Sequence, residues 1–493
     1  MKADLASRDR VTLAAVTIIA AAVRLFRLDH FSYGLDEIIQ GYWIQGSWDF
    51  FWKSLRFDAV HPPLDYLLAR LIESVHPADW VRKVPDVLWG TLTVPALALL
   101  VGRRAGRTAG IVSAILLAAA PFHVRYSQEF RPYSMSLFLL AAALLLFDCF
   151  LERPSAIRLA LLFAATLATA YTLYFAALVL AIAAGAMVME DSFSSEPGRR
   201  RHARRFLLWS PAFAGTLFLA YLPWWPVVVE AGRRPPMAAA APLTLARADR
   251  TVSFFLFATE GDQPLGIAGA LYLVLILAGL MIAIRRPGTR FLAAWSLGGF
   301  LAIELVGQLH PHYDFVRRFL PAGLALAPLA AVALAAIRGP ARGRAPAALA
   351  VAAILLVDGR SLARYFSSGR ADWRPLAAYL RRRPPGERVF TENQYTQLCV
   401  AFYVVGPNWL FDGGRTGRQI PNLEGDPSRL SYSWPPGERA WLVLAGEPRS
   451  APLRLWAMQL PERSFPSAED AMLADLEPSL REEALVSLPP PRR

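Results

Sequence analysis

The chain contains a series of apolar blocks, many of them long enough to cross a lipid bilayer, and this repetition constrains its fold more than any other feature. A membrane-spanning helix needs about 20 mostly apolar residues, and we expect about eleven such helices here. Their expected positions are 11–28, 84–101, 108–122, 134–151, 157–173, 174–190, 206–226, 265–284, 291–309, 319–337 and 345–358. The predicted fold class is a membrane all-α bundle, followed by a small C-terminal α/β domain.

Composition supports a membrane protein and argues against a nucleic-acid-binding one. Of the 493 residues, 55% are hydrophobic and 18% are charged, whereas soluble domains carry about 25% charged residues. The net charge of +13 comes largely from arginines in short loops between the apolar blocks. We therefore expect the membrane as a partner and no nucleic acid. The two cysteines, Cys149 and Cys399, lie in different kinds of segment, which predicts neither a disulfide nor a cysteine zinc site.

The basic loops predict the orientation of the helices. If the N-terminus is inside, every inner loop is basic, as the positive-inside rule requires. The arginines of these loops are Arg103, Arg104, Arg107, Arg153, Arg158, Arg199, Arg200, Arg201, Arg204, Arg205, Arg285, Arg286, Arg290, Arg338, Arg342 and Arg344. The outer segments are then 29–83, 123–133, 227–264, 310–318 and the chain after about 359. We read the first block as a retained span, because no small-residue cleavage site follows it.

This topology divides the chain into a transmembrane domain, 1–358, and an outer C-terminal domain, 359–493. In the second domain the sequence predicts a helix that runs through Leu380. Arg388–Thr391 and Trp441–Ala445 are typical of short buried strands between turns rich in proline and glycine.

Two adjacent carboxylates, Asp36 and Glu37, follow the first span directly. At a membrane boundary such residues indicate a general base or a metal ligand held in an interfacial cleft. Ordinary acidic residues of a loop would look the same. In the same segment Asp58 and His61 precede two prolines, which fix an extended turn and would hold both side chains rigidly near the membrane surface. A helix that simply starts at proline is the alternative.

Arginines lie beside two later spans on the predicted outer face. Arg131 comes just before the span at 134–151, and Arg317 and Arg318 come just before the span at 319–337. A lipid phosphate is the natural partner of such arginines, because a guanidinium donates two parallel hydrogen bonds to it. Snorkelling of the side chains to the interface is the alternative. The topology nevertheless places the carboxylates, His61 and these arginines on one side of the membrane, which favours chemistry on a phosphate-bearing lipid.

Other classes of function leave signals that this sequence lacks or shows weakly. No glycine-rich phosphate loop or Walker motif points to a nucleotide donor. A transporter or flippase would favour buried charges in mid-span, and Glu304 is the clearest acidic residue of that kind. A non-catalytic membrane scaffold would make the outer-face residues accidental. The Trp-Trp-Asp-Tyr-Gly signature of oligosaccharyltransferases is absent from the sequence.

The sequence resembles the polytopic GT-C glycosyltransferases that use polyprenyl-phosphate sugars. It is most similar to the bacterial branch related to protein O-mannosyltransferases, which includes the lipid A aminoarabinose transferases. The resemblance covers about residues 10–390. The motifs that carry it are Asp36-Glu37, His61-Pro62-Pro63-Leu64, Ser127-Gln-Glu-Phe-Arg131-Pro-Tyr133, Tyr171-Thr-Leu-Tyr174, Arg317-Arg318-Phe319-Leu320-Pro321 and Asp372-Trp373-Arg374.

The resemblance implies an inverting transfer of a sugar from a polyprenyl-phosphate donor to an acceptor hydroxyl of a lipid, glycan or protein. It implies that Asp36 is the catalytic base and that Glu37 positions the acceptor or tunes Asp36. It also implies a location in the bacterial inner membrane, with the site on the periplasmic face. Arg131, with Arg317 or Arg318, would hold the donor phosphate. The implied substrate-binding residues are Asp58, His61, Tyr133 and Tyr174. No cofactor is required, although Asp36, Glu37, Asp58 and His61 could supply ligands to a divalent metal ion.

Overall fold

A computed structural model describes the chain over residues 7–73, 78–234, 251–255, 266–309, 316–337, 341–367, 372–382, 388–391, 394–406, 439–444 and 454–459. The chain divides into two compact units. Unit 1 consists of Met1–Phe26, Leu55–Leu68 and Lys83–Tyr365, and unit 2 of Arg27–Ser54, Ala69–Arg82 and Phe366–Arg493. The first predicted outer segment thus contributes to both units.

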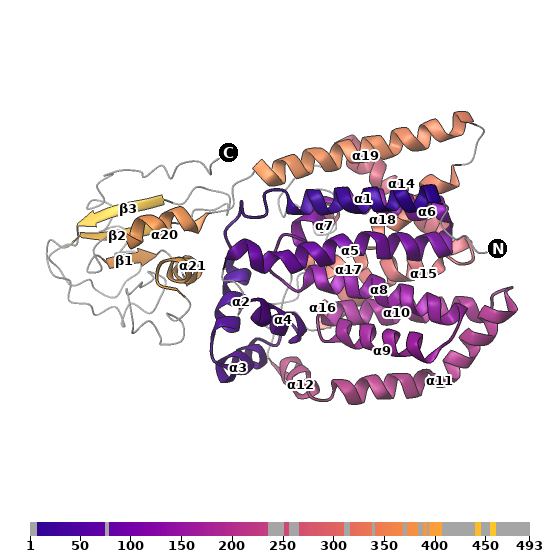
Figure 1. The fold of residues 1–493 in the computed structure, drawn as a ribbon, viewed down its shortest axis with the longest axis horizontal. Coiled ribbons are helices and arrows are strands. Elements are labelled where there is room, and N and C mark those ends of the chain that lie inside the picture. Colours follow the sequence, from indigo (N-terminus) through magenta and orange to yellow (C-terminus); the bar gives the residue numbers. More distant parts are fainter. Residues whose placement is uncertain are drawn as a thin grey trace. The chain divides into compact units, whose positions relative to one another are not determined.

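Unit 1 is built from helices (Figure 1). Those wholly within it are α1 (Ser7–Leu25), α6 (Arg107–Ala119), α7 (Pro121–Tyr126), α8 (Tyr133–Glu152), α9 (Ala156–Ala170), α10 (Tyr174–Ser192), α11 (Pro197–Tyr221), α12 (Trp225–Arg233), α14 (Gly266–Arg285), α15 (Arg290–Ala293), the π-helix η1 (Ala294–Gly298), α16 (Gly299–Leu309), the 3₁₀ helix η2 (Val316–Phe319), α17 (Leu320–Gly323) and α18 (Leu326–Ala336). Helices α3 (Trp48–Asp58), α4 (Leu64–Glu73), α5 (Asp79–Ala105) and α19 (Ala341–Ser367) each contribute residues to both units.

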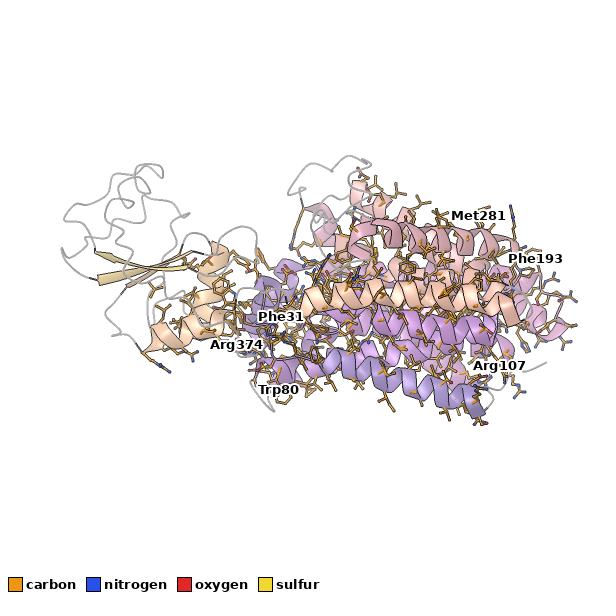
Figure 2. The ribbon with its side chains drawn as sticks, turned by 90° about the horizontal axis from the view of Figure 1, so that it is seen from above. Phe31, Trp80, Arg107, Phe193, Met281 and Arg374 are labelled. Carbon is orange, nitrogen blue, oxygen red and sulfur yellow. The ribbon has the colours of Figure 1, made fainter. Side chains whose placement is uncertain are left out.

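Five helical segments among the described residues are long and apolar enough to cross a membrane, and two bent helix pairs raise the number to seven. The bent pairs are α11 with α12, at 81°, and Val316–Gly323 with α18, at 41°. Shorter apolar helices, including α6 and α9, occupy other expected spans. Figure 2 shows apolar side chains such as Phe193 and Met281 pointing away from the bundle, where Phe193 is 76% exposed. The predicted multi-pass membrane fold is confirmed, and the count of eleven spans stays a prediction.

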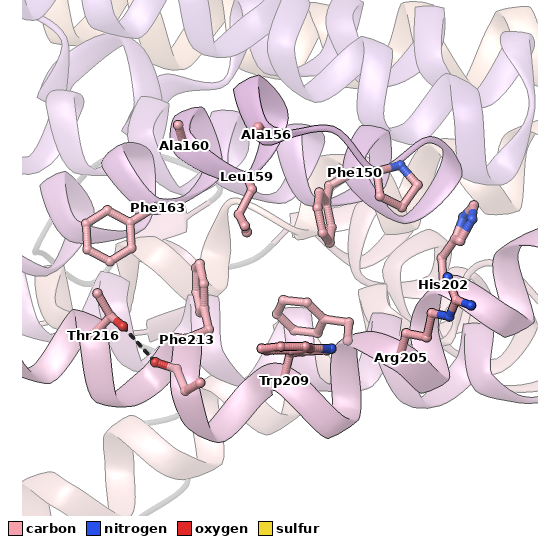
Figure 3. A pocket seen from close by; sticks show the side chains of 13 residues that line it. Phe150, Ala156, Leu159, Ala160, Phe163, His202, Arg205, Trp209, Phe213 and Thr216 are labelled. Carbon is pink, nitrogen blue, oxygen red and sulfur yellow. Dashed lines mark hydrogen bonds between the residues drawn. The ribbon is translucent and has the colours of Figure 1, made fainter.

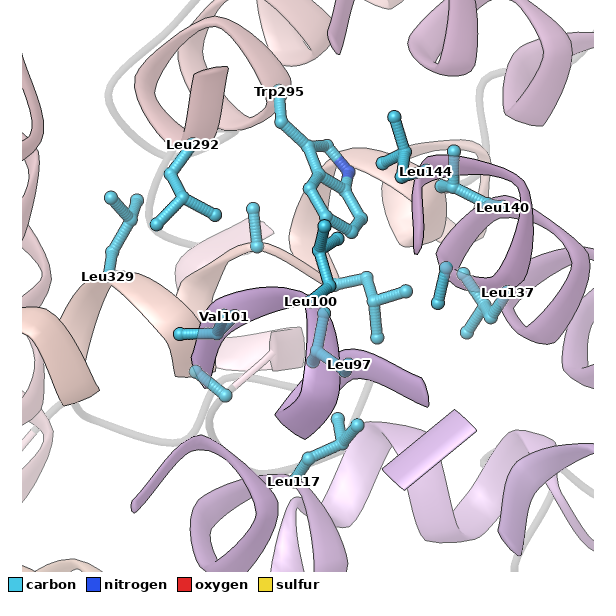
Figure 4. Packing of buried hydrophobic residues seen from close by; sticks show 14 of the residues in the cluster. Leu97, Leu100, Val101, Leu117, Leu137, Leu140, Leu144, Leu292, Trp295 and Leu329 are labelled. Carbon is cyan, nitrogen blue, oxygen red and sulfur yellow. The ribbon is translucent and has the colours of Figure 1, made fainter. Parts of the chain in front are cut away.

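Close packing of apolar helices holds unit 1 together. Trp295 of η1 is fully buried among leucines of α5 and α8 (Figure 4), and its indole Nε1 donates a hydrogen bond of 2.8 Å to the carbonyl of Pro321. Helices α14 and α18 approach so closely that a Cβ on Gly279 would lie 1.8 Å from the carbonyl oxygen of Leu329. Small residues permit such contacts between membrane helices, where packing rather than water exclusion drives association.

A buried ionic cluster joins four helices at the end of the bundle where α8 finishes. Asp148 of α8 accepts hydrogen bonds from Arg103 and Arg104 of α5, both at 2.5 Å, and from Arg199 of α11. Asp191 of α10 pairs with Arg104 at 2.8 Å and with Arg199 at 3.1 Å. These three arginines, which the sequence marks as topological signals, therefore also neutralise two buried carboxylates.

Unit 2 combines part of the first outer segment with C-terminal elements. Its helices include α2 (Leu35–Gln45), α20 (Trp373–Arg381) and α21 (Gln394–Val404). The strands β1 (Arg388–Thr391), β2 (Arg439–Leu444) and β3 (Arg454–Gln459) form one sheet in the order β1-β2-β3. Strand β1 pairs in parallel with β2, with Val389 opposite Trp441, and β2 pairs antiparallel with β3. The strand predicted at 388–391 matches β1, and that at 441–445 overlaps β2; β3 was not predicted.

Candidate active site

His61 is the centre of a buried polar group at one end of unit 1. Its side chain is 5% exposed, and its Nδ1 atom lies 3.4 Å from Nη2 of Arg131. Because a guanidinium only donates, Nδ1 must accept and the ring proton resides on Nε2. Burial, and then the charges of Arg131 and Arg317, hold the pKa of His61 well below its usual value. His61 is therefore neutral at physiological pH and can offer its Nε2–H as a donor.

The turn that carries His61 is fixed by its backbone. Ala59 adopts a positive φ of 52°, and the amide of Val60 donates to Oδ2 of Asp58 at 3.4 Å. After the two prolines, the amide of Leu64 donates to the carbonyl of Tyr171 at 2.9 Å, which ties this turn to the connection between α9 and α10. The paired prolines thus precede a helix, α4, and also lie in a turn held at both ends.

Arg131 lies in the turn between α7 and α8 and is 6% exposed. Aromatic rings surround this turn: the ring of Tyr133 packs edge-on against His61 at 5.7 Å and against Tyr126 at 5.1 Å. The buried Tyr66 of α4 also senses the charge of Arg131, although burial dominates and raises the pKa of this phenol. The group therefore combines one buried guanidinium, a neutral imidazole and phenol rings.

The two neighbouring arginines of η2 have different surroundings. Arg318 is buried and its Nη2 pairs with Oε2 of Glu304 at 2.7 Å, while Gln308 donates to the other carboxylate oxygen at 2.7 Å. A Cβ on Gly307 would lie 2.2 Å from Nη1 of Arg318, so this glycine makes room for the guanidinium. The charge of Arg317 acts instead on His61 and Tyr126. The sequence left open which arginine faces the site; in the structure Arg318 pairs with Glu304, and the charge of Arg317 acts on His61.

Tyr174, another predicted substrate-binding residue, begins α10. Its hydroxyl accepts a hydrogen bond of 2.9 Å from the indole Nε1 of Trp224. Trp224 is buried and precedes α12, at the 81° bend that follows α11. Tyr174 and Trp224 thereby link the start of α10 to this bend. The histidines and the aspartate at 310–314, which the sequence placed on the same face, lie outside the described residues.

Asp36 and Glu37 belong to unit 2, in the first turn of α2. Glu37 is 3% exposed, and its Oε2 accepts a hydrogen bond of 2.8 Å from the amide of Gly34, which caps the helix. Asp36 is half-buried. Carboxylates are favoured at this end of a helix by its dipole. Glu37 therefore has a structural task at the helix start, and Asp36 is the more accessible of the two carboxylates.

Helix α21 holds the segment that leads into α2. The hydroxyl of Tyr403 accepts a hydrogen bond of 2.8 Å from the amide of Tyr33 and donates one of 2.6 Å to Oδ2 of Asp79. The hydroxyl of Tyr42, on α2, donates to the carbonyl of Leu398 at 3.3 Å. No motif in the sequence marks Tyr403, because its contacts join positions more than 300 residues apart.

A second buried polar group, which sequence reasoning also missed, lies within the bundle. Arg24 of α1 is fully buried and donates to the carbonyl oxygens of Ala20, Leu117 and Ala118. Its Nη2 lies 2.8 Å from Nδ1 of His123, whose pKa burial and this charge hold well below its usual value. The sequence signal that could have found this group is Arg24 itself, a charged residue inside the apolar block at 11–28.

Metal-ligating side chains do not gather within the part of the chain that the structure describes. Among those residues there is no group of three or more His, Cys, Asp or Glu side chains that could hold a metal ion. Both cysteines are free, in agreement with the sequence prediction.

Comparison with known proteins adds the family context. Residues 60–225 match the family of dolichyl-phosphate-mannose-protein mannosyltransferases. No curated protein sequence matches the chain. Among solved structures, ArnT from Cupriavidus metallidurans bound to undecaprenyl phosphate is similar with a TM-score of 0.57 and 14% identity, over 88% of this chain and 92% of that one. The apo form of the same protein gives a TM-score of 0.53 with 14% identity.

An archaeal protein has a similar fold over a smaller share of its length. The Archaeoglobus fulgidus oligosaccharyltransferase in complex with Zn and sulfate gives a TM-score of 0.54 and 14% identity, over 83% of this chain and 62% of that one. The chain thus shares the fold of these two proteins, and its residues 60–225 match the mannosyltransferase family, in agreement with the resemblance to GT-C glycosyltransferases that the sequence predicts.

Proposed function

We propose that this protein is an inverting glycosyltransferase that moves a sugar from a polyprenyl-phosphate donor to an acceptor hydroxyl. The observation that carries the proposal is the buried pair of His61 and Arg131, which both lie within residues 60–225, the part that matches a mannosyltransferase family. The charge of Arg317, from outside that part, also acts on His61. Buried cations next to a neutral histidine suit a phosphate monoanion or diester, because burial strengthens each charge-assisted hydrogen bond. The similar ArnT structure contains undecaprenyl phosphate, which supports this class of ligand.

In the proposed reaction, the acceptor oxygen attacks the anomeric carbon as the bond from that carbon to the phosphate oxygen breaks. The electron pair leaves with the lipid phosphate, and the acceptor proton passes to Asp36. Arg131 and Arg317 stabilise the charge that develops on the leaving phosphate. Arg318 has a positioning role: its ion pair with Glu304 holds η2, the helix that also carries Arg317.

The remaining predicted residues have supporting roles. The Nε2–H of His61 donates to a phosphate or sugar oxygen, and Asp58, Tyr133 and Tyr174 line the sugar's position. Glu37 orients Asp36 by capping α2. A base contributes typically about 10²–10⁴-fold to rate, and the rest comes from holding donor and acceptor together. We assign the site and domain 359–493 to the periplasmic face of a bacterial inner membrane crossed about eleven times.

The first test measures binding of the product lipid, which is common to every sugar. Purified full-length protein in detergent is titrated with undecaprenyl phosphate while its thermal unfolding is followed. A ligand at 100 times its dissociation constant stabilises by about 2.7 kcal/mol. We expect the wild type, Asp36→Asn and the control Arg290→Ala to be stabilised, and Arg131→Ala not to be. Arg290 is a suitable control because it is solvent-exposed and lies in α15, outside the His61 group.

The second arm measures release of undecaprenyl phosphate from undecaprenyl-phosphate sugars in the presence of an acceptor preparation. A glycosyltransferase releases the lipid phosphate, and Asp36→Asn abolishes release while binding persists. Binding without release by the wild type would instead indicate a transporter or flippase. Equal stabilisation of the wild type and all three variants would remove the support for a phosphate site at Arg131.

A further inference from the structure

An apolar cavity of about 920 Å³ lies between α9 and α11, at the end of α8 (Figure 3). Its volume is in the range of small-molecule sites. The side chains that form its walls are Phe150, Leu159, Phe163, Phe206, Trp209 and Phe213. Thr216 lies at the other end of the cavity, and its hydroxyl donates to the carbonyl of Ala212 at 2.8 Å. Because this proton is used within α11, that end of the cavity is largely apolar. The cavity suits a hydrocarbon chain.

One end of this cavity is polar and basic. His202 and Arg205 line it there and are three residues apart on α11, which places them on the same helix face. The Nδ1 atom of His202 lies 3.0 Å from the carbonyl oxygen of Leu151, so Nδ1 must carry a proton and the ring is fixed against the end of α8. The other ring nitrogen is left for a further partner.

Arg205 differs from Arg199 and Arg204, which precede it on α11. Arg199 is paired with Asp148 and Asp191, and Arg204 donates to the carbonyl of Ser192. Over the described ranges, the guanidinium of Arg205 makes neither a hydrogen bond nor an ion pair. Its positive charge therefore remains available at the mouth of an apolar cavity, whereas the charge of Arg199 is neutralised by two carboxylates.

We propose that this cavity binds one anionic phospholipid, with an acyl chain between α9 and α11 and its phosphate on Arg205 and His202. The guanidinium can give the phosphate two parallel hydrogen bonds, and the cavity replaces bilayer packing around the chain. The cavity is separate from the His61 group, because the two lie at opposite ends of α8. Tyr133, which packs against His61, begins this helix, and Phe150, which lines the cavity, lies near its end at Glu152. The proposal does not depend on the proposed catalytic function.

Native mass spectrometry of the full-length protein tests this proposal. Protein freed of endogenous lipid is mixed with phosphatidylglycerol, or with phosphatidylcholine of the same acyl chains, and the retained lipid is counted. We expect one retained phosphatidylglycerol, and a dissociation constant about tenfold higher for Arg205→Gln, as the loss of a charge-assisted bond predicts. The matched control is Arg200→Gln, an exposed arginine on the same helix, which should bind as the wild type does.

A second variant tests the chain part of the site. Ala160→Phe places a ring in the cavity and should abolish retention, while the melting temperature of the lipid-free protein stays that of the wild type and shows that the bundle is folded. Equal retention of the two lipids, or equal binding by Arg205→Gln and Arg200→Gln, would overturn the proposal and identify only general lipid contact. Displacement of phosphatidylglycerol by undecaprenyl phosphate in the Arg131→Ala variant would identify the cavity as a second donor-lipid site and also overturn it.

Discussion

Two consecutive residues, Arg317 and Arg318, have different surroundings. Arg318 is paired with Glu304 and is fitted over Gly307, whereas the charge of Arg317 acts on His61. Sequence alone treats the pair as equivalent. Their separate contacts predict separate consequences of mutation.

We expect Arg318→Ala to destabilise the protein by about 3 kcal/mol, because it removes the cation that pairs with the largely buried Glu304. Arg317→Ala should change stability by less than about 1 kcal/mol and should weaken undecaprenyl phosphate binding. Thermal unfolding with and without this lipid measures both. A large loss of stability from Arg317→Ala with unchanged binding would contradict the assignment.

His61 makes stability depend on pH. Its pKa is lower in the folded chain than the usual 6.5, so below 6.5 the unfolded chain binds a proton that the folded chain does not. Stability therefore falls as the pH decreases below about 6.5. His61→Gln should flatten the fall in melting temperature between about pH 7.5 and 5.5. His123 should retain its own part of the fall. Identical pH profiles for the variant and wild type would refute a buried neutral His61.

At the scale of helices, ionic contacts and tyrosine hydroxyls connect elements that are distant in the sequence. Asp148 ties α8 to α5 and α11, and Tyr403 ties α21 to the start of α2. The hydrophobic pattern predicts each helix by itself but gives no information on these joints, since each partner is an ordinary loop or helix residue when read alone.

The Asp148 contacts can be tested with a matched neighbour. Asp148→Asn should cost about 3–5 kcal/mol, because three arginines lose the buried charge that neutralises them. Glu152→Gln, one turn further along α8, should cost about 0.5 kcal/mol, since its pair with Arg103 is partly solvent-exposed. Denaturation in detergent measures both changes. Similar effects of the two substitutions would show that burial does not set the strength of this cluster.

Tyr403 predicts that unit 2 affects catalysis through the position of α2. Tyr403→Phe removes the hydroxyl that contacts Tyr33 and Asp79. Tyr33 lies three residues before Asp36. Under the proposed function, we expect turnover to fall about tenfold, which is the effect of misplacing a group by a fraction of an ångström. The thermal shift with undecaprenyl phosphate should persist. Turnover equal to that of the wild type would show that this contact does not position the base.

At the scale of the whole molecule, the predicted topology is the claim with the widest consequences. Cysteine labelling tests it, with Cys149 and Cys399 first replaced by serine. Ser47→Cys and Ser155→Cys are both at exposed positions. A membrane-impermeant maleimide should label Ser47→Cys in intact cells and Ser155→Cys only after the membrane is opened. Labelling of both, or the reverse pattern, would require a different orientation from the one that the basic loops predict.

The sequence by itself determined the membrane class, most helix positions, the strand at β1 and the family resemblance. Length and polarity of the apolar blocks decide these, because the bilayer imposes a fixed thickness and forces backbone hydrogen bonds into helices. Motifs also located Arg131 and His61 as candidates, although their roles remain proposals.

Only the tertiary structure decided which polar groups meet. It paired Arg318 with Glu304, set His61 beside Arg131, buried Arg24 against His123 and brought Tyr403 to Tyr33. It also divided the first outer segment between two units, which a linear reading of domains at 1–358 and 359–493 does not describe. The physical reason is that a buried charge is stabilised by whichever donor or acceptor the packing of helices places within hydrogen-bond distance, and that packing depends on contacts between residues far apart in the chain.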